Sequence, residues 1–266
     1  MNYKDYFKDK KISVIGLGPH GEMLANIKFL VKSKFTVSIY DIRSEERLSE
    51  ILPSLKDLEI TKASYGKIDS EELLNSDLIL LSPEISKKSS FLKKAVESGI
   101  QIEYPDILFF KLVPTVTLVG IMGSYGKSTL IHLVYSMLRK SFIDYVGQGL
   151  FVIDSDSLNG SLAHLKKIKK GDVIVVKISE NFIQYYHSIH MSPHVAVIIS
   201  KVSPKILEFQ TYNNFIVASD EVIDSIKDEI EIRAKILRTR ESSVPNEWIA
   251  HRNTIYDREN AALALQ

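Results

Sequence analysis

Cysteine is absent from the 266-residue chain. The sequence therefore offers no disulfide framework, no thiolate metal site and no cysteine nucleophile. A marked excess of charge is also missing, because 34 lysines and arginines nearly balance 33 aspartates and glutamates, for a net charge of +1. This balance argues against binding of nucleic acid through bulk electrostatics, which normally requires a basic surface.

Long hydrophobic runs are missing as well. The start of the chain, Met1–Lys11, is charged, and the apolar run after it is interrupted by Gly16 and Gly18. No run approaches the roughly 18 apolar residues of a membrane span, and no signal-peptide pattern is visible. We therefore expect a cytoplasmic protein without a membrane span.

The length suits one large domain or two ordinary ones. Hydrophobic residues make up 45% and charged residues 25% of the chain, as in globular proteins. Short apolar segments alternate with segments of helical period throughout, which predicts α/β domains with mostly parallel sheets. We place the boundary between two such domains near Val113–Pro114, giving residues 1–113 and 114–266.

One stretch combines several features of a phosphate-binding loop. An apolar, β-branched run ends near Gly123, and residues with helical period follow from Lys127 onward. Gly123 and Gly126 permit backbone conformations in which several N–H groups converge on a phosphate. Lys127 would supply a cation for the β/γ-phosphates, which makes it the candidate catalytic residue, and the Ser128 hydroxyl could bind Mg²⁺. The start of the helix adds the positive end of its dipole.

The spacing of this loop departs from the general P-loop pattern. Ile121 stands where the pattern has its first glycine, and the glycines fall instead at Gly120, Gly123 and Gly126. A glycine-rich turn with an incidental lysine is the alternative, disfavoured because strand, glycines, lysine and helix all agree. The predicted ATP site comprises Gly123, Ser124, Tyr125, Gly126, Lys127, Ser128 and Thr129.

A second glycine-rich loop lies near the start of the chain. A short apolar strand from Ile12 runs into the G-x-G-x-x-G sequence Gly16–Gly21, and helix-period residues follow. The next strand, Phe35–Tyr40, ends at Asp41, about 20 positions after the loop, where an acidic residue would bind a ribose hydroxyl. Alone, this pattern predicts an NAD site. The structural alternative is that Asp41 only caps the turn after the strand.

Three features disfavour NAD. Pro19 lies inside the loop, the phosphate-binding stretch follows downstream, and the strand ends in the acidic–basic sequence Asp41–Arg43.

After Arg43, strand-like and helix-like segments continue in alternation, with a helix expected at Ser86–Ser98 and a strand at Ile100–Tyr104.

Several of these motifs, in this order, resemble the Mur ligases, which are ATP-dependent amino-acid ligases of peptidoglycan precursor synthesis. The resemblance rests on Gly120–Thr129, on Asp41–Arg43 and on Ser82–Ile85, and it covers nearly all of the first 140 residues. It is strongest for the D-glutamate-adding branch, in which the third motif reads Ser-Pro-Gly-Ile. Here Glu84 replaces its glycine.

The resemblance implies a Rossmann-like first domain that binds UDP and a P-loop central domain that binds ATP and Mg²⁺. In the family, ATP phosphorylates the carboxylate of a UDP-linked muramoyl peptide, and an amino acid then attacks the acyl phosphate. Asn260 matches the adenine-facing residue of the family. An ordinary helix with asparagine near its start would show the same sequence pattern. The implied UDP-binding residues are Gly18, Pro19, His20, Gly21, Asp41, Ile42, Arg43, Ser82 and Pro83.

Other family features have no counterpart in this sequence. Lys177 stands where the family has a glutamate that binds Mg²⁺, and Glu180 follows three residues on. The turn Ser200–Lys205 lacks the acid and histidine of the family, and Val146–Gly149 is at most a remnant of its substrate loop. The modified lysine is missing. We also expect the third domain of the family to be missing, unless a partner chain supplies it.

The sequence therefore predicts a Mur-type ligase of weak or no activity by itself. A degenerate homologue that binds nucleotide without ligating is the first alternative, and a generic P-loop ATPase or kinase is the second. A dehydrogenase is less favoured. His187, His190 and His194 are expected to have structural or surface roles rather than to bind zinc, because no carboxylate lies at a matching spacing.

Overall fold

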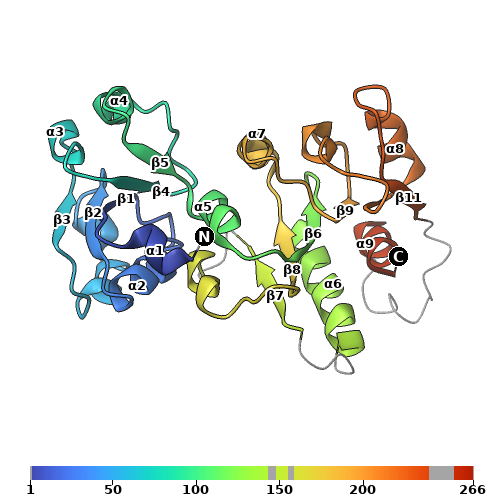
Figure 1. The fold of residues 1–266 in the computed structure, drawn as a ribbon, viewed down its shortest axis with the longest axis horizontal. Coiled ribbons are helices and arrows are strands. Elements are labelled where there is room, and N and C mark those ends of the chain that lie inside the picture. Colours follow the sequence, from blue (N-terminus) through green and yellow to red (C-terminus); the bar gives the residue numbers. More distant parts are fainter. Residues whose placement is uncertain (1, 143–147, 155–158, 240–254, 266) are drawn as a thin grey trace. The chain divides into compact units, whose positions relative to one another are not determined.

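The computed structural model describes residues 2–142, 148–154, 159–239 and 255–265, with only the backbone described for 140–142 and 255–259. The chain divides into two compact units (Figure 1). The first unit comprises Met1–Val113 and Asp154–Lys167, and the second comprises Pro114–Ile153 and Ile168–Gln266.

The first unit is built on a five-stranded, fully parallel sheet in the order β3-β2-β1-β4-β5. β1 lies between β2 and β4, and its last residue, Ile15, is in register with Tyr40 and Leu81. The loops after these three strands therefore start at the same edge of the sheet, where ligands bind in open parallel sheets. The strands are β1 (Lys11–Ile15), β2 (Thr36–Asp41), β3 (Lys62–Tyr65), β4 (Leu78–Leu81) and β5 (Gln101–Glu103).

Short helices connect these strands. α5 begins at Pro105, whose fixed φ suits the first turn of a helix. The α-helices are α1 (Tyr3–Phe7), α2 (Leu24–Lys32), α3 (Ser70–Leu73), α4 (Lys93–Glu97) and α5 (Pro105–Leu112). Single 3₁₀ turns span Glu46–Leu48, Leu52–Leu55, Ser90–Leu92 and Leu162–Lys166.

The predicted helix Ser86–Ser98 is wrong in its first half. Ser86 forms local hydrogen bonds instead, because its hydroxyl accepts from Lys88 N at 3.1 Å and its carbonyl accepts from the Ser89 hydroxyl at 2.8 Å. Serine side chains offer the backbone such alternatives to a helix. The α-helical part is therefore confined to α4.

The first unit also includes a short segment from the middle of the chain. The buried Asn26 side chain on α2 accepts a hydrogen bond from Leu162 N at 3.0 Å. The Lys166 ammonium lies 5.1 Å from the centre of the Phe29 ring. Sequence patterns give no sign of this packing, because the segment lies between two strands of the second unit.

The second unit has a six-stranded, fully parallel sheet in the order β11-β10-β9-β6-β8-β7. β6 lies between β8 and β9, so the loop after β6 leaves from the middle of the carboxyl edge. The strands are β6 (Thr117–Met122), β7 (Leu150–Ile153), β8 (Val173–Lys177), β9 (Val195–Ile198), β10 (Phe215–Ala218) and β11 (Lys235–Arg238).

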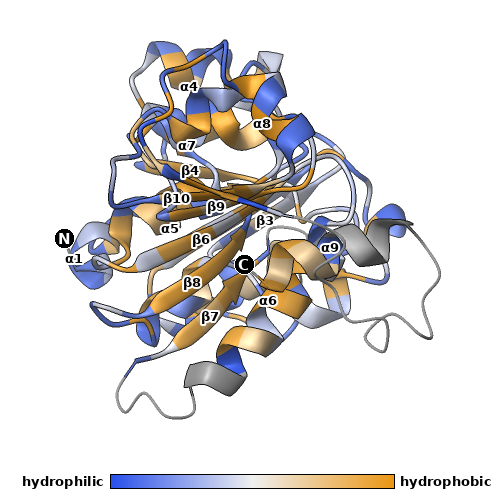
Figure 2. Cartoon of the chain, turned by 90° about the vertical axis from the view of Figure 1, so that its right-hand side faces the viewer, coloured by the Kyte–Doolittle hydropathy of each residue, from blue (hydrophilic) through white to orange (hydrophobic). Residues whose placement is uncertain are grey.

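Helices α6 and α9 cover one face of this sheet. Leu130 and Val134 of α6 and Leu263 of α9 pack in a single core with strand residues such as Val175. The strands are hydrophobic along most of their length, as expected for parallel strands buried on both faces (Figure 2). The helices are α6 (Lys127–Phe142), α7 (Ile183–Ser188), α8 (Asp220–Ile226) and α9 (Ile255–Leu265), with 3₁₀ turns at Glu180–Phe182 and Pro204–Leu207.

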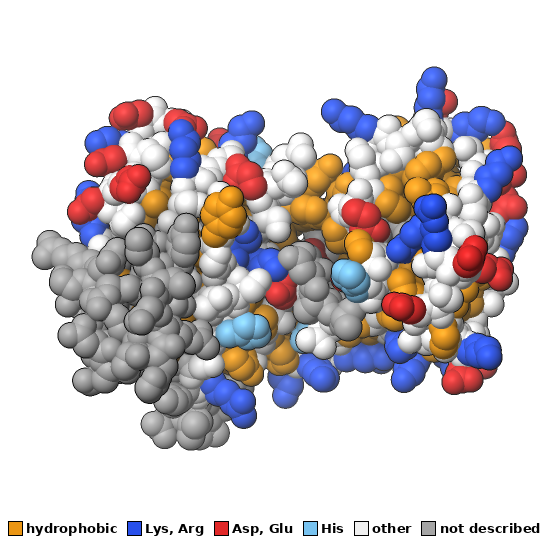
Figure 3. All heavy atoms as spheres, turned by 180° about the vertical axis from the view of Figure 1, so that it is seen from behind, with side chains coloured by type: hydrophobic (Ala, Val, Ile, Leu, Met, Phe, Trp, Pro, Cys, Tyr) orange, Lys and Arg blue, Asp and Glu red, His pale blue; other side chains and the backbone are white. Residues whose placement is uncertain are grey.

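The two parallel sheets confirm the predicted α/β class. Acidic and basic side chains both occur on the described parts of the surface, as Figure 3 shows for one face. In the part of the chain that the structure describes, no helix is long and apolar enough to cross a bilayer.

Candidate functional site

The loop between β6 and α6 depends on two glycines. Gly123 has a φ of 135° and Gly126 a φ of 75°, a region of backbone conformation that L side chains rarely adopt. A Cβ added to Gly126 would lie 3.0 Å from Asn260 Nδ2, so α9 also leaves no room there. Both glycines are therefore required by the conformation of this loop and not only by its motif.

Lys127, the first residue of α6, folds its side chain back over the loop. Its ammonium donates to the carbonyl of Gly123 at 2.6 Å and to that of Ser124 at 3.3 Å. Ser124 N donates to the Ser200 hydroxyl at 2.8 Å, which ties the loop to the chain after β9. Tyr125, at the tip of the loop, is exposed. An anion at this loop would meet an ammonium that is already in place.

Lys177 lies below the first turn of α6. Side chains alternate along a strand, so Lys177 emerges on the same face of β8 as Val173 and Val175, which pack in the core with α6. Its ammonium lies 3.4 Å from the Ser128 hydroxyl, and the residue is only 5% exposed. Ser128 therefore faces a cation where the Mur-type pattern has a carboxylate.

The described side chains around Ser128 offer little to a Mg²⁺ ion. Among the described residues there is no group of three or more histidine, aspartate or glutamate side chains that could hold a metal. Glu180, the nearest acid after Lys177, accepts a hydrogen bond from Ser203 N at 2.9 Å, and Lys201 is paired with Glu229 at 2.7 Å. Mg²⁺ prefers carboxylate oxygens in octahedral geometry. The expected Mg²⁺ at Ser128 stays a prediction, and these residues give it little support.

Asn260 contributes an open acceptor beside the loop. The residue is 3% exposed, and among the atoms that the structure describes no hydrogen-bond partner reaches its Oδ1. Buried amide oxygens are nearly always hydrogen-bonded, because leaving one unpaired costs about 1–3 kcal/mol. A ligand with an amine donor could satisfy this atom.

A cavity of about 560 Å³ opens at the carboxyl ends of β9, β10 and β11. It shares Ser200 with the loop anchor, and α9 provides its Ala262 and Leu263 walls. Polar groups of Ser219 and Thr239 also line it. The second unit thus combines the glycine loop after β6 with a cavity nearby, both bordered by α9.

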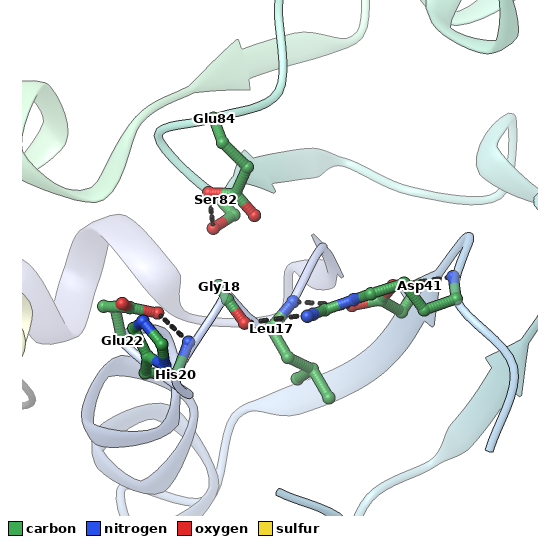
Figure 4. A network of polar contacts seen from close by, with 8 residues as sticks. Leu17, Gly18, His20, Glu22, Asp41, Ser82 and Glu84 are labelled. Carbon is green, nitrogen blue, oxygen red and sulfur yellow. Dashed lines mark hydrogen bonds and ion pairs between the residues drawn. The ribbon is translucent and has the colours of Figure 1, made fainter. Parts of the chain in front are cut away.

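In the first unit, Asp41 is buried and saturated with hydrogen bonds. Leu17 N donates to its Oδ2 at 2.9 Å (Figure 4), while Arg43 donates to Oδ1 through its backbone N (2.9 Å) and Nε (3.0 Å), and to Oδ2 through Nη2 (2.7 Å). Burial raises the pKa of Asp41, but the hydrogen bonds from Arg43 and Leu17 outweigh it and hold the pKa below its ordinary value. Four donors fill the acceptor sites of a carboxylate, so Asp41 holds Arg43 in place rather than offering an oxygen to a ligand.

Arg43 connects this carboxylate to the glycine loop. Its Nη2 also donates to the carbonyl of Gly18 at 3.0 Å, and its side chain is 25% exposed. The hydrogen bond to Asp41 raises the pKa of Arg43, which is charged at any physiological pH. Its remaining nitrogen, Nη1, carries two further N–H groups suited to a ligand oxygen. Ile42, between these two residues, is 59% exposed.

Two glutamates lie against the same loop. His20 N donates to Glu22 at 2.9 Å, and a Cβ added to Gly18 would lie only 2.2 Å from that carboxylate. Figure 4 shows Glu22 and Asp41 on opposite sides of Gly18. Glu84 accepts from the Ser82 hydroxyl at 2.5 Å, beside Pro83. A bound diphosphate would therefore meet negative charge here.

A cavity of about 490 Å³ lies on the α2 side of the glycine loop. Pro19, His20 and Gly21 line it together with the basic residues Lys28 and Arg47 and the acidic residue Glu50. The predicted loop residues thus face a hollow with charges of both signs.

The three histidines have structural contacts, in agreement with the expectation from the sequence. His187 pairs with Glu208 at 2.5 Å, and His190 packs edge-on against the Phe209 ring at 4.9 Å. His194 Nδ1 accepts from Leu118 N at 3.0 Å, and burial lowers the pKa of this ring. Accepting that hydrogen bond requires the neutral form, which the lowered pKa favours.

In the expected substrate loop Val146–Gly149, the first two residues lie outside the described residues. Gly149 N donates to the buried carboxylate of Asp172 at 2.7 Å, which is a structural contact.

Three residues at the two loops were not among the predicted site residues: Ser200, Glu22 and Glu84. Ser200 follows a predicted strand, but only the observed strand order brings β9 beside β6.

A family model described as "Mur ligase MurD-like, N-terminal domain" matches residues 10–103. A UDP-N-acetylmuramoylalanine–D-glutamate ligase from Desulfosudis oleivorans is 29% identical over 219 residues, which are 82% of this chain and 45% of that protein. The protein of the same name from Clostridium botulinum is 27% identical over 250 residues, or 87% and 51%. The chain spans about half the length of the curated relatives it matches.

A solved structure has a similar fold. The UDP-N-acetylmuramate:L-alanyl-gamma-D-glutamyl-meso-diaminopimelate ligase from Neisseria meningitides aligns with a TM-score of 0.62, covering 96% of this chain and 92% of that chain. At 14% identity, this likeness shows the fold alone. The family model matches the first unit alone, and the curated relatives match both units, so the chain is similar to Mur ligases over most of its length.

Proposed function

We propose that the chain binds ATP through its second unit and a UDP-linked muramoyl substrate through its first. These are the two nucleotide-binding parts of a ligase of peptidoglycan precursor synthesis. The observation that carries the proposal is the loop after β6, where Gly123 and Gly126 have positive φ angles and the Lys127 ammonium donates to the Gly123 carbonyl. A cytoplasmic location stays a prediction.

The geometry of the second unit supports a particular orientation of ATP. Its phosphates would lie on the loop and at the start of α6, where free backbone N–H groups and the helix dipole favour an anion. The amino group of adenine would donate to the unsatisfied Oδ1 of Asn260, which lies against Gly126. The neighbouring cavity beside Ser200 offers room for the rest of the nucleoside.

Arg43 is the group in the first unit best placed for a uridine nucleotide. Asp41 fixes its guanidinium beside Gly18, and Nη1 then faces a ligand with two donors. The same saturation of Asp41 disfavours NAD, whose ribose would need a free carboxylate oxygen at this position.

Calorimetric titration with ATP, a UDP-muramoyl peptide and NAD tests this proposal. We expect ATP and the UDP compound to bind independently, one molecule of each, and NAD to bind weakly or not at all. NAD binding as tight as that of the UDP compound would favour a dehydrogenase-type site instead.

The negative charge of Glu22 should oppose a UDP ligand. We expect Glu22→Gln to tighten binding of the UDP compound by about fivefold, because one unit charge at 4 Å in water is worth about 1 kcal/mol. Glutamine keeps an oxygen that can accept the hydrogen bond from His20 N. Glu59→Gln, at an exposed pair with Lys34, is the control and should change nothing. Unchanged or weaker binding in Glu22→Gln would show that the phosphates lie elsewhere.

A nucleotide-binding homologue with little ligase activity is the second candidate function. It is favoured by Lys177, whose charge replaces the carboxylate of the Mur-type pattern beside Ser128. At about 4 Å and an effective dielectric near 20, one unit charge is worth about 4 kcal/mol, enough to change the chemistry at this position. Replacing this carboxylate should therefore lower turnover more than it lowers nucleotide binding.

We therefore expect little phosphate release when ATP, the muramoyl-alanine nucleotide and D-glutamate are all present. The background is the rate of Lys127→Ala under the same conditions. Substrate-dependent release well above this background would establish the ligase activity and reject the second candidate.

A further inference from the structure

We propose that the first unit docks on an anionic membrane surface through a hollow with a rim of lysines. The hollow has a volume of about 560 Å³ and lies within the first unit. The residues that line this lysine hollow are Tyr3, Lys4, Lys32, Ser33, Phe35 and Lys166. None of them belongs to either proposed nucleotide site, so membrane docking is independent of the proposed function.

Packed aromatic rings form the floor of the lysine hollow. α1 lies against α2, where the centre of the Tyr3 ring is 5.6 Å from that of Phe29 (Figure 1). The centre of the Phe7 ring lies 5.2 Å from that of Phe35 and 6.5 Å from that of Phe29. Phe7 and Phe29 are buried, whereas Tyr3 and Phe35 are half-buried and line the hollow. The lysines therefore stand around a packed apolar base.

The three lysines come from separate parts of the chain. Lys4 is in α1, and Lys32 is the last residue of α2. Lys166 ends the 3₁₀ turn Leu162–Lys166, and its ammonium lies 5.1 Å from the centre of the Phe29 ring. Because this turn is far from α1 and α2 in the sequence, only the fold brings the three positive charges to one hollow.

No acidic side chain offsets this charge at the hollow. Asp5 follows Lys4 in α1, but the lining residues include no aspartate or glutamate. In the part of the chain that the structure describes, none of the three lysines of the hollow forms an ion pair. Lys34, close to Lys32 in the sequence, is by contrast paired with Glu59 at 3.0 Å. The hollow is therefore a local concentration of positive charge on a chain whose net charge is only +1.

The exposure of the lysines favours a membrane over a small soluble anion. All three are exposed, whereas small ligands are held in pockets that bury most of their surface. A bilayer with anionic lipids instead attracts lysines that remain at its hydrated surface. The long flexible stem of lysine lets each ammonium reach the phosphate of a different lipid. Tyr3 suits the same surface, because tyrosine places an apolar ring and a polar hydroxyl at the level of the headgroups.

Sedimentation of the whole chain with lipid vesicles tests this proposal. One set of vesicles contains phosphatidylglycerol and phosphatidylcholine in equal parts, and the other contains phosphatidylcholine alone. We expect the chain to sediment with the first set only, and to be released at about 1 M NaCl, where the Debye length falls to about 3 Å. Failure to sediment with the anionic vesicles at low salt, or equal binding to both sets, would overturn the proposal.

A variant with Lys4→Ala, Lys32→Ala and Lys166→Ala assigns the binding to the hollow. Each lysine near an anionic surface is worth about fivefold in affinity, or about 1 kcal/mol, so this variant should bind roughly 100-fold more weakly. The matched control replaces three other exposed lysines by alanine, none of which forms an ion pair among the described residues: Lys56, Lys88 and Lys205. The control loses the same charge and should bind nearly as well as the unaltered chain. Equal weakening in both variants would mean that only overall charge matters, against the proposal.

Hydrogen exchange of the unaltered chain provides a readout that needs no variant and holds even if the triple variant fails to fold. With anionic vesicles we expect slower exchange in α1 and at the C-terminal end of α2 than with phosphatidylcholine alone. Slowing confined to other elements would overturn the proposal. Binding to soluble polyglutamate as tight as to the anionic vesicles would also overturn it, in favour of an acidic protein partner.

Discussion

Replacing Lys127 by alanine is expected to weaken ATP binding roughly 10- to 100-fold. The Lys127 ammonium already lies at the loop, bonded to the carbonyls of Gly123 and Ser124, so it needs little rearrangement to meet a phosphate. A hydrogen bond to a charged partner contributes about 1.5–3 kcal/mol, which corresponds to this range of affinity. Isothermal titration calorimetry measures the change directly.

The control for Lys127→Ala is Lys235→Ala. Lys235 is an exposed lysine at the start of β11, at the edge of the sheet opposite the loop. Its loss changes the net charge equally and should leave the affinity for ATP unchanged. An equal loss of affinity in both variants would mean that ATP responds to overall charge rather than to this loop.

Asp41→Ala should lower the stability of the first unit by about 3 kcal/mol. Asp41 is 2% exposed and receives hydrogen bonds from Leu17 N and from three nitrogens of Arg43. Breaking a buried ion pair by removing one partner typically costs 3–5 kcal/mol, and the lower value applies because Arg43 is partly exposed. Urea denaturation followed by circular dichroism measures the loss, and hydrogen exchange at β1 and β2 assigns it to this unit.

The pH dependence of the same pair has a definite sign. The pKa of Asp41 is lower in the folded state than its ordinary value of about 3.9, so its stabilisation is fully present above that value. It is lost as the pH falls through the folded pKa. In Asp41→Ala this acid-dependent part should disappear.

Glu59→Ala is the control for Asp41→Ala, because Glu59 forms an exposed pair with Lys34 that should contribute less than about 1 kcal/mol. If Asp41→Ala were as stable as this control, Asp41 would not hold the loop, and a ligand-binding role for its carboxylate would regain support.

The features predicted best from the sequence are those set by neighbouring residues. The loop at 123–126 combines a strand, two glycines, a lysine and a helix within about twenty residues, and the structure has each of them in place. The alternation of apolar strands with helices predicted two parallel sheets for the same reason. The position of Lys177 beside Ser128 followed from family resemblance, since a strand register is not visible in one sequence.

Features that depend on distant residues were not predictable. Glu22 and Glu84 reach the glycine loop through side-chain conformations; Glu22 has no sequence signal beyond its charge, and Glu84 stands out only as the replacement of a glycine in the Ser-Pro-Gly-Ile motif. Asp41 was expected to be near a ligand, but its saturation depends on how Arg43 folds back over Gly18. The packing of Leu162 on Asn26 joins residues 136 positions apart.

We expect ATP to lie on the loop between β6 and α6. The most direct measurement is amide chemical-shift mapping by NMR of the isotope-labelled chain during titration with ATP. We expect large shifts at Gly123, Gly126 and Lys127 and at the start of α6, with the Gly16–Gly21 loop unaffected. Shifts confined to Gly16–Gly21, or no shift at Gly126 under saturating ATP, would contradict it.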